Sequence, residues 1–310
     1  MNRRPVFSVI INCYNGEKYL REAIDSVLAQ TFQDWELIFW DNQSTDGSAE
    51  IFKNYTDARL KYFHAPKHTV LYEARNYAIE KASGDFFAFL DVDDWWLPEK
   101  LALQLPLFDD LEVGVACGNY IVVSERQNKR WTGFTRPIPT GWVLNELLDS
   151  YFVGLLTLVV RRTAFESLSY PCDPRYHVSG DFDLVVRLSL HWKIAAVQKP
   201  IACYRLHGAN ETDKHRALAV TERKLWCSEA SENKEIGNTP GFRRFVAAVH
   251  YREAMNDLMR GNHRAAFHLM RQLPLGRQKI KLVVALVLPR RVWTLRHNRP
   301  VGPAVSDLGQ

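Results

Sequence analysis

The sequence predicts an α/β fold in which a mostly parallel central sheet is flanked by helices. Up to about residue 100, short apolar runs alternate with amphipathic stretches, which is typical of parallel β-α-β units. The run 86–90 is apolar throughout, as in a strand buried on both faces. Polar residues directly follow several of these strands, at the edge where such sheets bind ligands.

The elements of the first hundred residues follow in order. Val6–Ile11 is expected to form the first strand and Glu17–Gln30 the first helix, whose apolar residues recur at helical spacing. The further strands expected are Glu36–Trp40, Leu60–His64 and Phe86–Leu90, and the further helices are Ser48–Tyr55 and Leu71–Ala82.

The second half is less regular. The expected strands are Gly114–Val123, Leu156–Arg161, Lys193–Val197 and Ile201–Tyr204, with a helix at Asp181–His191. Beyond His215 the pattern becomes helical, with Gly261-Asn262 as a break and a last helix at Arg277–Leu288. We therefore expect an α/β domain at residues 1–212 and a helical C-terminal appendage at residues 213–310.

Composition narrows the class of protein. With 46% hydrophobic and 24% charged residues, the chain has an ordinary globular composition. Its five cysteines are scattered and form no Cys-x-x-Cys pair, so neither a disulfide framework nor a zinc site is indicated. Because no signal peptide or bilayer-spanning run is evident, a cytoplasmic location is expected.

The net charge of +5 hides an asymmetry along the chain. Residues 258–306 contain ten Lys or Arg and no acidic residue, which leaves 30 basic against 35 acidic residues elsewhere. The protein is thus a mildly acidic body with a strongly basic C-terminal region.

Three carboxylates stand at the end of the apolar run: Asp91, Asp93 and Asp94. Mutually repelling carboxylates at the mouth of a core strand are costly unless a cation compensates them. Alternating Asp oxygens suit a hard divalent ion that keeps positions open for substrate phosphates. The alternative is an Asp-rich turn that caps a helix starting near Pro98, a role open to Asp94 in particular.

Five segments together resemble family-2 glycosyltransferases of the GT-A fold, over roughly residues 5–212. They are 8–20 (SVIINCYNGEKYL), 27–47 (ending in WDNQSTDG), 74–101 (with DVDDWWLPEKL), 180–188 (GDFDLVVRL) and 204–208 (YRLHG). Two positions depart from the family pattern, which often has Pro or Thr at Asn12 and Glu at Gly180.

The resemblance implies transfer of a sugar, with inversion, from a nucleotide-diphosphate sugar to a glycan or lipid-linked acceptor. A UDP-sugar is favoured as donor, and the implied cofactor is a divalent metal, Mn²⁺ or Mg²⁺. The expected metal ligands are Asp91, Asp93 and His207. The expected nucleotide-sugar-binding residues are Asn12, Tyr14, Asn15, Glu17, Asp41, Arg75, Asp91 and Asp93, with Asp94 and Arg205 as further candidates.

Asp181 is the expected general base, since inversion requires one carboxylate on the acceptor side. As the first acid of a predicted helix, it has helix capping as its ordinary alternative role. Asp183 does not share a helical face with Asp181, so the two are not expected to serve the same centre. The position in the family motif favours Asp181 over Asp183. Asp41 and Glu17 likewise have ordinary alternatives, as a turn-forming Asp and a first-turn helix acid.

The basic C-terminal region could attach peripherally to an anionic membrane surface. Cations flank the apolar stretch 282–288, and Trp293 follows it, a combination suited to a membrane interface. The alternative is a helix packed on the protein with a solvated basic face. Nucleic acid is not expected as a partner, because the region lacks interleaved aromatic residues.

Two other functions remain as alternatives. The first is a non-catalytic nucleotide-sugar-binding protein of the same fold, which the departure at Gly180 keeps open. The second is a sugar-phosphate nucleotidyltransferase. It would need a glycine-rich basic loop after the first strand, whereas 12–18 contains one glycine and one lysine.

Overall fold

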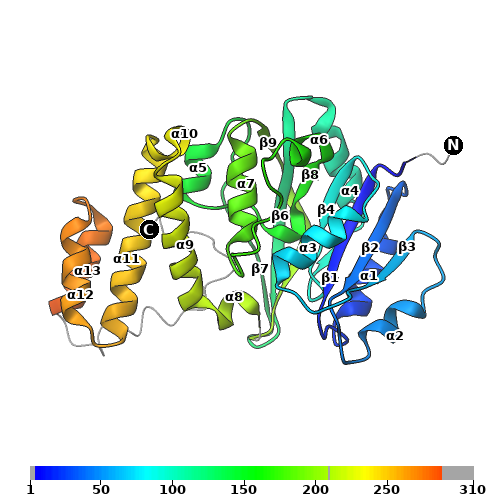
Figure 1. Ribbon diagram of the computed structural model, residues 1–310, viewed down its shortest axis with the longest axis horizontal. Helices are drawn as coiled ribbons and strands as arrows, with labels where there is room; N and C mark the ends of the chain where they lie inside the picture. The colour runs from blue at the N-terminus through cyan, green and yellow to red at the C-terminus, as the bar shows by residue number, and fades with distance from the viewer. Residues whose placement is uncertain (1–3, 209, 288–310) are drawn as a thin grey trace. The chain divides into compact units, whose positions relative to one another are not determined.

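The computed structural model describes residues 4–208 and 210–287 (Figure 1). The chain divides into two compact units. The first contains Met1–Val143 and Phe152–Asn210, and the second contains Leu144–Tyr151 and Glu211–Gln310. The sequence did not indicate that a segment near residue 148 belongs with the C-terminal helices.

The first unit is built on a nine-stranded sheet of the order β3-β2-β1-β4-β8-β6-β9-β5, with β7 paired to β6. The strands are β1 (Phe7–Cys13), β2 (Trp35–Asp41), β3 (Leu60–His64), β4 (Phe86–Phe89), β5 (Trp95–Trp96), β6 (Val113–Ser124), β7 (Lys129–Thr132), β8 (Val159–Arg161) and β9 (Lys193–Leu206). Strands β1 to β4 are mutually parallel, and β8 joins β4 in the antiparallel sense. The prediction of an α/β fold with a mostly parallel sheet is confirmed.

Helices connect these strands, as Figure 1 shows. They are α1 (Leu20–Leu28), α2 (Ser48–Lys53), α3 (Leu71–Glu80), α4 (Lys100–Gln104), α6 (Arg162–Glu166) and α7 (Gly180–Ser189), with short 3₁₀ turns η1 (Leu105–Asp109) and η2 (Leu155–Thr157). Because parallel strands need a crossover connection, the helices α1, α2 and α3 follow from the strand order.

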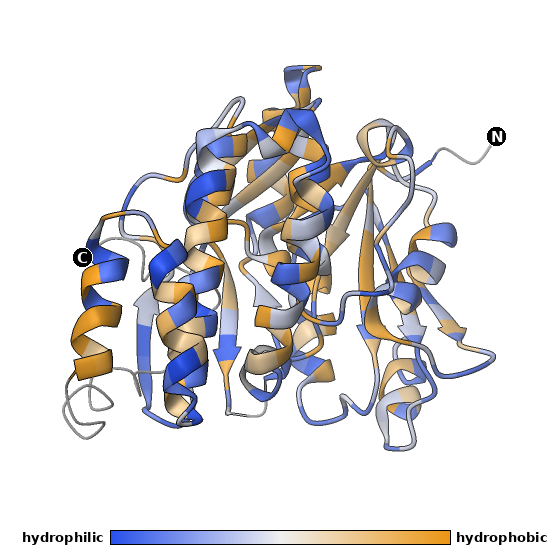
Figure 2. Cartoon of the chain, turned by 60° about the vertical axis from the view of Figure 1, so that its left-hand side comes forward, coloured by the Kyte–Doolittle hydropathy of each residue, from blue (hydrophilic) through white to orange (hydrophobic). Residues whose placement is uncertain are grey.

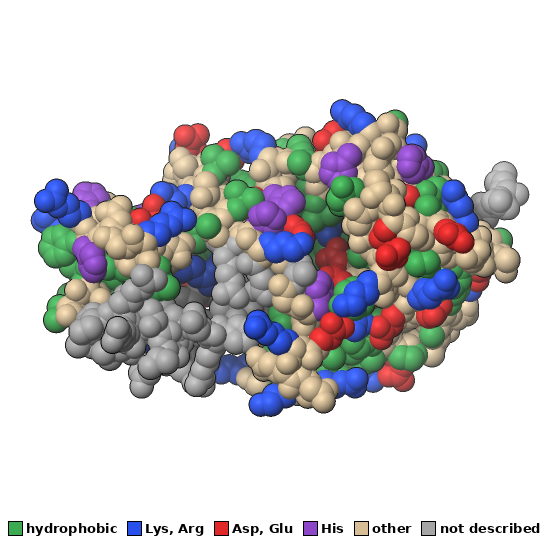
Figure 3. All heavy atoms as spheres, turned by 90° about the horizontal axis from the view of Figure 1, so that it is seen from below, with side chains coloured by type: hydrophobic (Ala, Val, Ile, Leu, Met, Phe, Trp, Pro, Cys, Tyr) green, Lys and Arg blue, Asp and Glu red, His purple; other side chains and the backbone are tan. Residues whose placement is uncertain are grey.

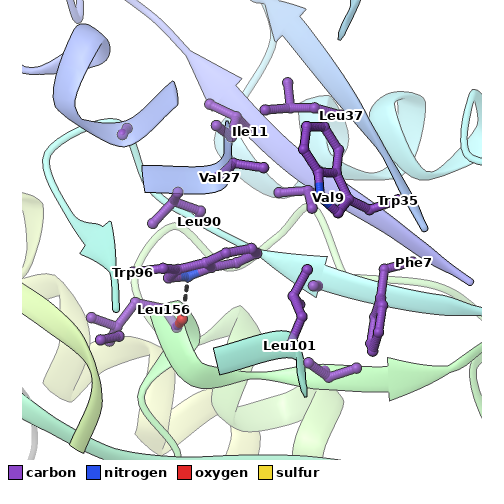
Figure 4. Packing of buried hydrophobic residues seen from close by; sticks show 14 of the residues in the cluster. Phe7, Val9, Ile11, Val27, Trp35, Leu37, Leu90, Trp96, Leu101 and Leu156 are labelled. Carbon is purple, nitrogen blue, oxygen red and sulfur yellow. Dashed lines mark hydrogen bonds between the residues drawn. The ribbon is translucent and has the colours of Figure 1, made fainter. Parts of the chain in front are cut away.

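The core between α1 and the sheet consists of side chains from β1, β2 and the segment after β4 (Figure 4). Phe7, Trp35 and Trp96 are its large members, and each is at most 2% exposed. The indole Nε1 of Trp96 donates to the Leu156 carbonyl at 2.8 Å, so its one polar atom is satisfied inside the core. Figure 2 shows these strands as mostly hydrophobic.

A buried carboxylate ties the sheet together near the amino ends of its parallel strands. The Oε1 atom of Glu36 accepts from the Ser8 hydroxyl at 2.6 Å and from the Ser83 N–H at 2.6 Å, and Lys61 pairs with Oε2. Burial opposes ionisation of Glu36, but these donors outweigh it, and its pKa lies below the usual value.

The prediction of two strands at Lys193–Val197 and Ile201–Tyr204 was wrong. They form one strand, β9, paired in parallel with β6 through a register shift between Gly118 and Asn119. Pro200 lies at that irregularity. Because the regular hydrogen-bond pattern between β6 and β9 is already interrupted there, the missing N–H of proline is tolerated. Similarly, the predicted strand at Leu156–Arg161 is shorter, because its first residues form η2.

The second unit is helical within the described residues, which confirms a helical C-terminal region. It contains α5 (Leu144–Asp149), α8 (Glu211–Lys214), α9 (Arg216–Ala230), α10 (Lys234–Gly237), α11 (Pro240–Met259), α12 (His263–Gln272) and α13 (Arg277–Val287). The predicted break is present, and Gly261 there has φ +83°. Among the described residues, no helix has the length and apolar character needed to cross a bilayer. Trp293 and the end of the predicted last helix lie outside the described residues.

Candidate active site

Asp41 closes β2 and is 1% exposed. Its Oδ1 accepts from the backbone N–H of Ser44 at 2.8 Å, and its Oδ2 accepts from the Tyr62 hydroxyl at 2.6 Å. The first contact is the turn-forming role that the sequence left open. The pKa of Tyr62 is raised, mainly by burial and then by the hydrogen bond to Asp41 and its charge. The Tyr62 phenol therefore stays a donor.

Tyr14 and Asn12 lie at the end of β1. Tyr14 is 54% exposed, and its ring centroid is 4.4 Å from that of His68, whose Nδ1 is 2.9 Å from the Asn42 carbonyl oxygen. Tyr14 thus presents an accessible aromatic surface. The amide nitrogen and oxygen of Asn12 are buried, and within the described residues they have no hydrogen-bond partner. Such a group is costly unless a ligand or water satisfies it.

Asn15 and Glu17 connect the loop after β1 to the loop after β2. Asn15 Oδ1 accepts from the Thr45 N–H at 2.8 Å, and Glu17 Oε2 accepts from the Gly47 N–H at 2.7 Å. Asn15 also adopts φ +55°, a left-handed conformation that Asn tolerates well. These contacts shape the edge of the sheet, and a direct contact of either residue with a donor stays a prediction.

Asp91 and Arg75 form an ion pair just beyond the end of β4. The guanidinium of Arg75, on α3, is 2.6 Å from Asp91 Oδ1, and the Arg75 side chain is 4% exposed. Burial alone would lower the pKa of Arg75, but the charge of Asp91 raises it above its usual value. The arginine is therefore a fixed positive charge beside the aspartate cluster.

Asp94 is the buried member of the cluster, at 3% exposure. Its Oδ1 accepts from the Arg205 backbone N–H at 2.9 Å, so it joins the loop after β4 to β9. Burial, followed by the charges of Asp93 and Asp91, raises the pKa of Asp94 well above the usual value. These contacts support a structural role for Asp94, but a different one from the helix cap that the sequence left open: α4 begins at Lys100 with Glu99 as its N-cap and has no side-chain cap.

Asp93 meets His207 across a sequence separation of 114 residues: Oδ2 of Asp93 is 3.0 Å from Nε2 of His207. Arg205 contacts the same residue, because its Nε donates to the Asp93 carbonyl at 2.9 Å. The Arg205 guanidinium also pairs with Glu125 at 3.0 Å and with Glu22. Two carboxylates thus already balance its charge, and an interaction of Arg205 with a donor phosphate stays a prediction.

The donor atoms of Asp93 and His207 fit a divalent ion. Two ligands at right angles on an ion with bonds of about 2.1 Å are about 3 Å apart, close to the separation that these two atoms have. One carboxylate oxygen and one imidazole nitrogen suit Mn²⁺ as well as Mg²⁺ with retained waters.

Asp181 is the second residue of α7 and contacts Tyr72 of α3. Its backbone N–H donates to the Tyr72 hydroxyl at 3.0 Å, and that hydroxyl is 3.4 Å from Asp181 Oδ1. Asp183 makes a different contact: it is buried and pairs with Arg187 at 2.8 Å, one helical turn on. The ion pair with Arg187 gives Asp183 a structural role, and the role of Asp181 as an acceptor-side base stays a prediction.

Helix α3 brings the predicted residues together. Arg75 contacts Asp91, and Tyr72, one turn earlier, contacts Asp181, with the Arg75 guanidinium 5.0 Å from the Tyr72 ring centroid. Tyr72 was not predicted from the sequence. The only sequence signal for it was its spacing of three residues from Arg75, which places both on one face of the helix.

The described residues 8–166 match the model of the family "Glycosyl transferase family 2". A curated relative is the UDP-Glc:alpha-D-GlcNAc-diphosphoundecaprenol beta-1,3-glucosyltransferase WfgD of Escherichia coli. It is 34% identical over 164 residues, 53% of this chain and 63% of that protein, so the match spans less than two thirds of the relative.

Two solved structures share the fold. S. aureus TarS 1–349 in complex with UDP-GlcNAc aligns with a TM-score of 0.70 at 18% identity, over 90% of this chain and 86% of TarS 1–349. The mannosyltransferase PcManGT from Pyrobaculum calidifontis, in complex with GDP-Man and Mn²⁺, aligns with a TM-score of 0.60 at 16% identity, over 95% and 84%. At these identities the likeness establishes the GT-A fold.

Proposed function

This chain belongs to glycosyltransferase family 2, and on that premise we propose that it transfers a sugar, with inversion, from a nucleoside-diphosphate sugar to an acceptor hydroxyl. A UDP-sugar is the favoured donor, and a glycan or lipid-linked glycan is the proposed acceptor. The E. coli relative, which is named for a UDP-Glc donor and a lipid diphosphate acceptor, supports both choices.

The observation that carries the proposal is the convergence of donor-side and acceptor-side carboxylates on α3. Arg75 holds Asp91, and Tyr72 contacts Asp181 one turn away on the same helix. A single displacement needs its leaving group and its base on opposite sides of one carbon. Two carboxylates held by one helix, one following β4 and the other at the start of α7, support an arrangement of this kind.

On the donor side, Tyr14 offers an exposed ring on which a base can stack, and the unsatisfied amide of Asn12 lies two residues away. Asp41 accepts two hydrogen bonds and retains further lone pairs for a base N–H. Asp93 and the imidazole of His207, which lie together, would hold a divalent ion, and Asp91, whose Oδ1 is engaged by Arg75, is proposed as a further ligand. When bound, that ion would offset the negative charge that develops on the diphosphate leaving group.

On the acceptor side, we assign Asp181 as the general base. Its carboxylate accepts the proton of the acceptor hydroxyl as that oxygen bonds to the anomeric carbon. The bond from the anomeric carbon to the diphosphate oxygen breaks at the same time, and its electron pair leaves with the nucleoside diphosphate. At the first turn of α7 the helix dipole favours the ionised carboxylate, which is the form a base requires.

Donor binding is tested by thermal unfolding with UDP, GDP, dTDP and CMP, each with and without Mn²⁺. Ligand that binds only the folded state raises the melting temperature by mass action. We expect a metal-dependent rise with UDP that is lost in Asp93→Asn. No rise with any nucleotide would refute a nucleotide-sugar site.

Catalysis is tested with Asp181→Asn. Transfer should fall by roughly two to four orders of magnitude, the usual contribution of general base catalysis, while the UDP-induced thermal shift is kept. If the wild-type protein shows that shift but transfers no sugar to any glycan acceptor, the non-catalytic binding protein is favoured instead. Unchanged transfer by Asp181→Asn would remove this residue from the mechanism.

We also propose that the second unit attaches to an anionic membrane surface through α12 and α13. On α13, Ile280, Val283, Val284 and Val287 are all exposed, at the i, i+3, i+4, i+7 spacing of one helical stripe. Leu282 and Ala285 lie on the opposite face, which is buried in the hydrophobic cluster of the second unit. Among the described residues, the exposed stripe is not part of that buried cluster. Figure 2 shows the last turns of α13 as hydrophobic.

Charge identifies the surface that this stripe fits. Residues 258–287 contain basic side chains and no acidic one, and Figure 3 shows Lys, Arg and His beside hydrophobic side chains at the end where α12 and α13 lie. On α12, Arg264 and Arg271 lie one turn before and after the exposed Phe267. An apolar stripe between cations suits an anionic interface, where each basic residue contributes about 1 kcal/mol. A lipid-linked acceptor would be presented at such a surface.

A further inference from the structure

Gly180 stands where family members often carry glutamate, and the structure shows why a side chain is excluded there. A Cβ atom at residue 180 would lie 2.6 Å from three atoms of the Tyr72 ring. Carbon atoms do not approach this closely without displacement of one of them. Because the Tyr72 side chain is 3% exposed and packed inside the protein, its ring has little freedom to move. The glycine therefore makes room for the tyrosine.

The ring that occupies this space brings a hydroxyl to the next residue. The Tyr72 oxygen accepts the N–H of Asp181 at 3.0 Å and lies 3.4 Å from Oδ1 of the same residue. A phenol can accept one hydrogen bond and donate another, so it can contact the main chain and the carboxylate together. The accepted N–H is among the first of α7, a group that has no partner within its own helix.

Two neighbours on α3 hold the tyrosine and the segment it faces. Arg75 lies over the Tyr72 ring at 5.0 Å from its centroid and is itself fixed by Asp91. Asn76 exchanges hydrogen bonds with the backbone of Cys172, at 2.8 Å and 3.0 Å. One face of α3 thus forms hydrogen bonds with two positions of the segment 172–181, at Cys172 and at Asp181.

The phenol stays protonated under ordinary conditions. Burial, followed by the charge of Asp181, raises the pKa of Tyr72 well above its usual value, and the nearby Arg75 opposes this only in part. The hydroxyl can therefore still donate to the Asp181 carboxylate at pH values where an ordinary phenol would begin to ionise. Such donation stabilises the charged form, which is the form that removes a proton.

From this geometry we infer that Tyr72 is the positioning residue for the base Asp181, and that Gly180 is the small residue that lets its ring reach that place. The inference rests on the proposed role of Asp181. In this protein the contact of Tyr72 with Asp181 takes the place of the glutamate that family members often have at position 180. The glycine at this position is therefore no longer a sign of lost catalysis.

The test is Tyr72→Phe in the whole chain, with Tyr77→Phe on the same helix as the matched control. Phe keeps the ring that packs on Gly180 and removes only the hydroxyl. The Tyr77 hydroxyl donates to Glu73 Oε1 at 3.0 Å. Among the described contacts, it makes none with Asp91 or Asp181. Melting temperature and the UDP-induced thermal shift verify that both variants fold and bind donor.

We expect Tyr72→Phe to lower kcat by about 10- to 100-fold, the usual effect of losing a hydrogen bond to a charged group, with the donor KM within about twofold. The acid limb of the kcat/KM profile should move to higher pH, because loss of the donated bond raises the pKa of the base. Tyr77→Phe should match wild type in both respects.

The failure of this inference is distinguishable from failure of the proposed function. If Tyr72→Phe keeps the wild-type kcat and acid limb while Asp181→Asn is inactive, Asp181 is the base but Tyr72 does not position it. If Tyr72→Phe loses donor binding as well, the tyrosine supports the fold and not the base, and the inference is likewise refuted. Unchanged transfer by Asp181→Asn would remove the base on which this inference rests, whereas a wild-type protein with neither a UDP-induced thermal shift nor sugar transfer would refute the proposed function itself.

Discussion

The contact between Gly180 and Tyr72 makes a quantitative prediction about stability. The perturbation is Gly180→Ala, which adds one methyl group at the start of α7. That Cβ would be 2.6 Å from ring atoms of Tyr72, whereas ordinary contacts begin at 3.4 Å. The ring or the helix must therefore shift by most of an ångström to accept it.

The magnitude follows from two opposing effects. Overpacking of a buried contact costs about 1–3 kcal/mol of folding free energy. Alanine regains up to about 1 kcal/mol over glycine through helix propensity, and less than this in a first turn. The net expected destabilisation is about 1–2 kcal/mol, or a fall in melting temperature of roughly 2–8 °C for a unit of this size.

The assay is a double-mutant cycle with Tyr72→Leu, followed by urea or thermal unfolding. Leucine lacks the ring atoms Cε2 and Cζ that meet residue 180, and its Cδ atoms can rotate away, so in that background Gly180→Ala should be neutral or stabilising. The coupling should amount to about 1–3 kcal/mol. Gly276→Ala is the control, because open space surrounds Gly276. If Gly180→Ala has wild-type stability, or if its cost persists in the Tyr72→Leu background, the steric argument is refuted.

Three further predictions concern metal, pH and membrane. His207→Gln should weaken the Mn²⁺-dependent part of the UDP thermal shift and leave any metal-free shift unchanged; an unaltered Mn²⁺ titration would exclude His207 as a ligand. Because the pKa of Glu36 is lowered on folding, the stability it contributes is present above its unfolded pKa of 4.5 and is lost as pH falls through the folded value. Unfolding of Glu36→Gln should accordingly show a lower stability at pH 7 and a smaller loss between about pH 5 and pH 3 than wild type, and parallel pH curves would contradict this assignment. Val287→Asp should reduce flotation with anionic vesicles by at least about tenfold, whereas Leu111→Asp, at nearly the same exposure (77% against 76%), should not. Equal flotation of both variants, or self-association through α13 without vesicle binding, would refute attachment through this stripe.

Local patterns predicted much of the fold because they record burial directly. The expected strand Leu60–His64 has the same bounds in the structure, and the helix expected at Leu71–Ala82 ends two residues early. The short strand Trp95–Trp96 was not expected, since two residues carry no periodic signal. Likewise, β9 was divided at Pro200, where only the partner strand shows that an irregularity accommodates the proline.

The sequence by itself determined the α/β fold, the family and the chain positions of the carboxylates, because apolar periodicity and short motifs are local properties. Only the tertiary structure decided what those carboxylates contact. Asp93 meets His207 across 114 residues, and Asp181 meets Tyr72 across 109. Pairing over such distances depends on how the strands order themselves in the sheet and how α3 packs against α7, and no local pattern encodes that arrangement. From the sequence, Gly180 is only a departure from the family motif. The structure supplies its reason, because the Tyr72 ring occupies the space that a side chain at residue 180 would need.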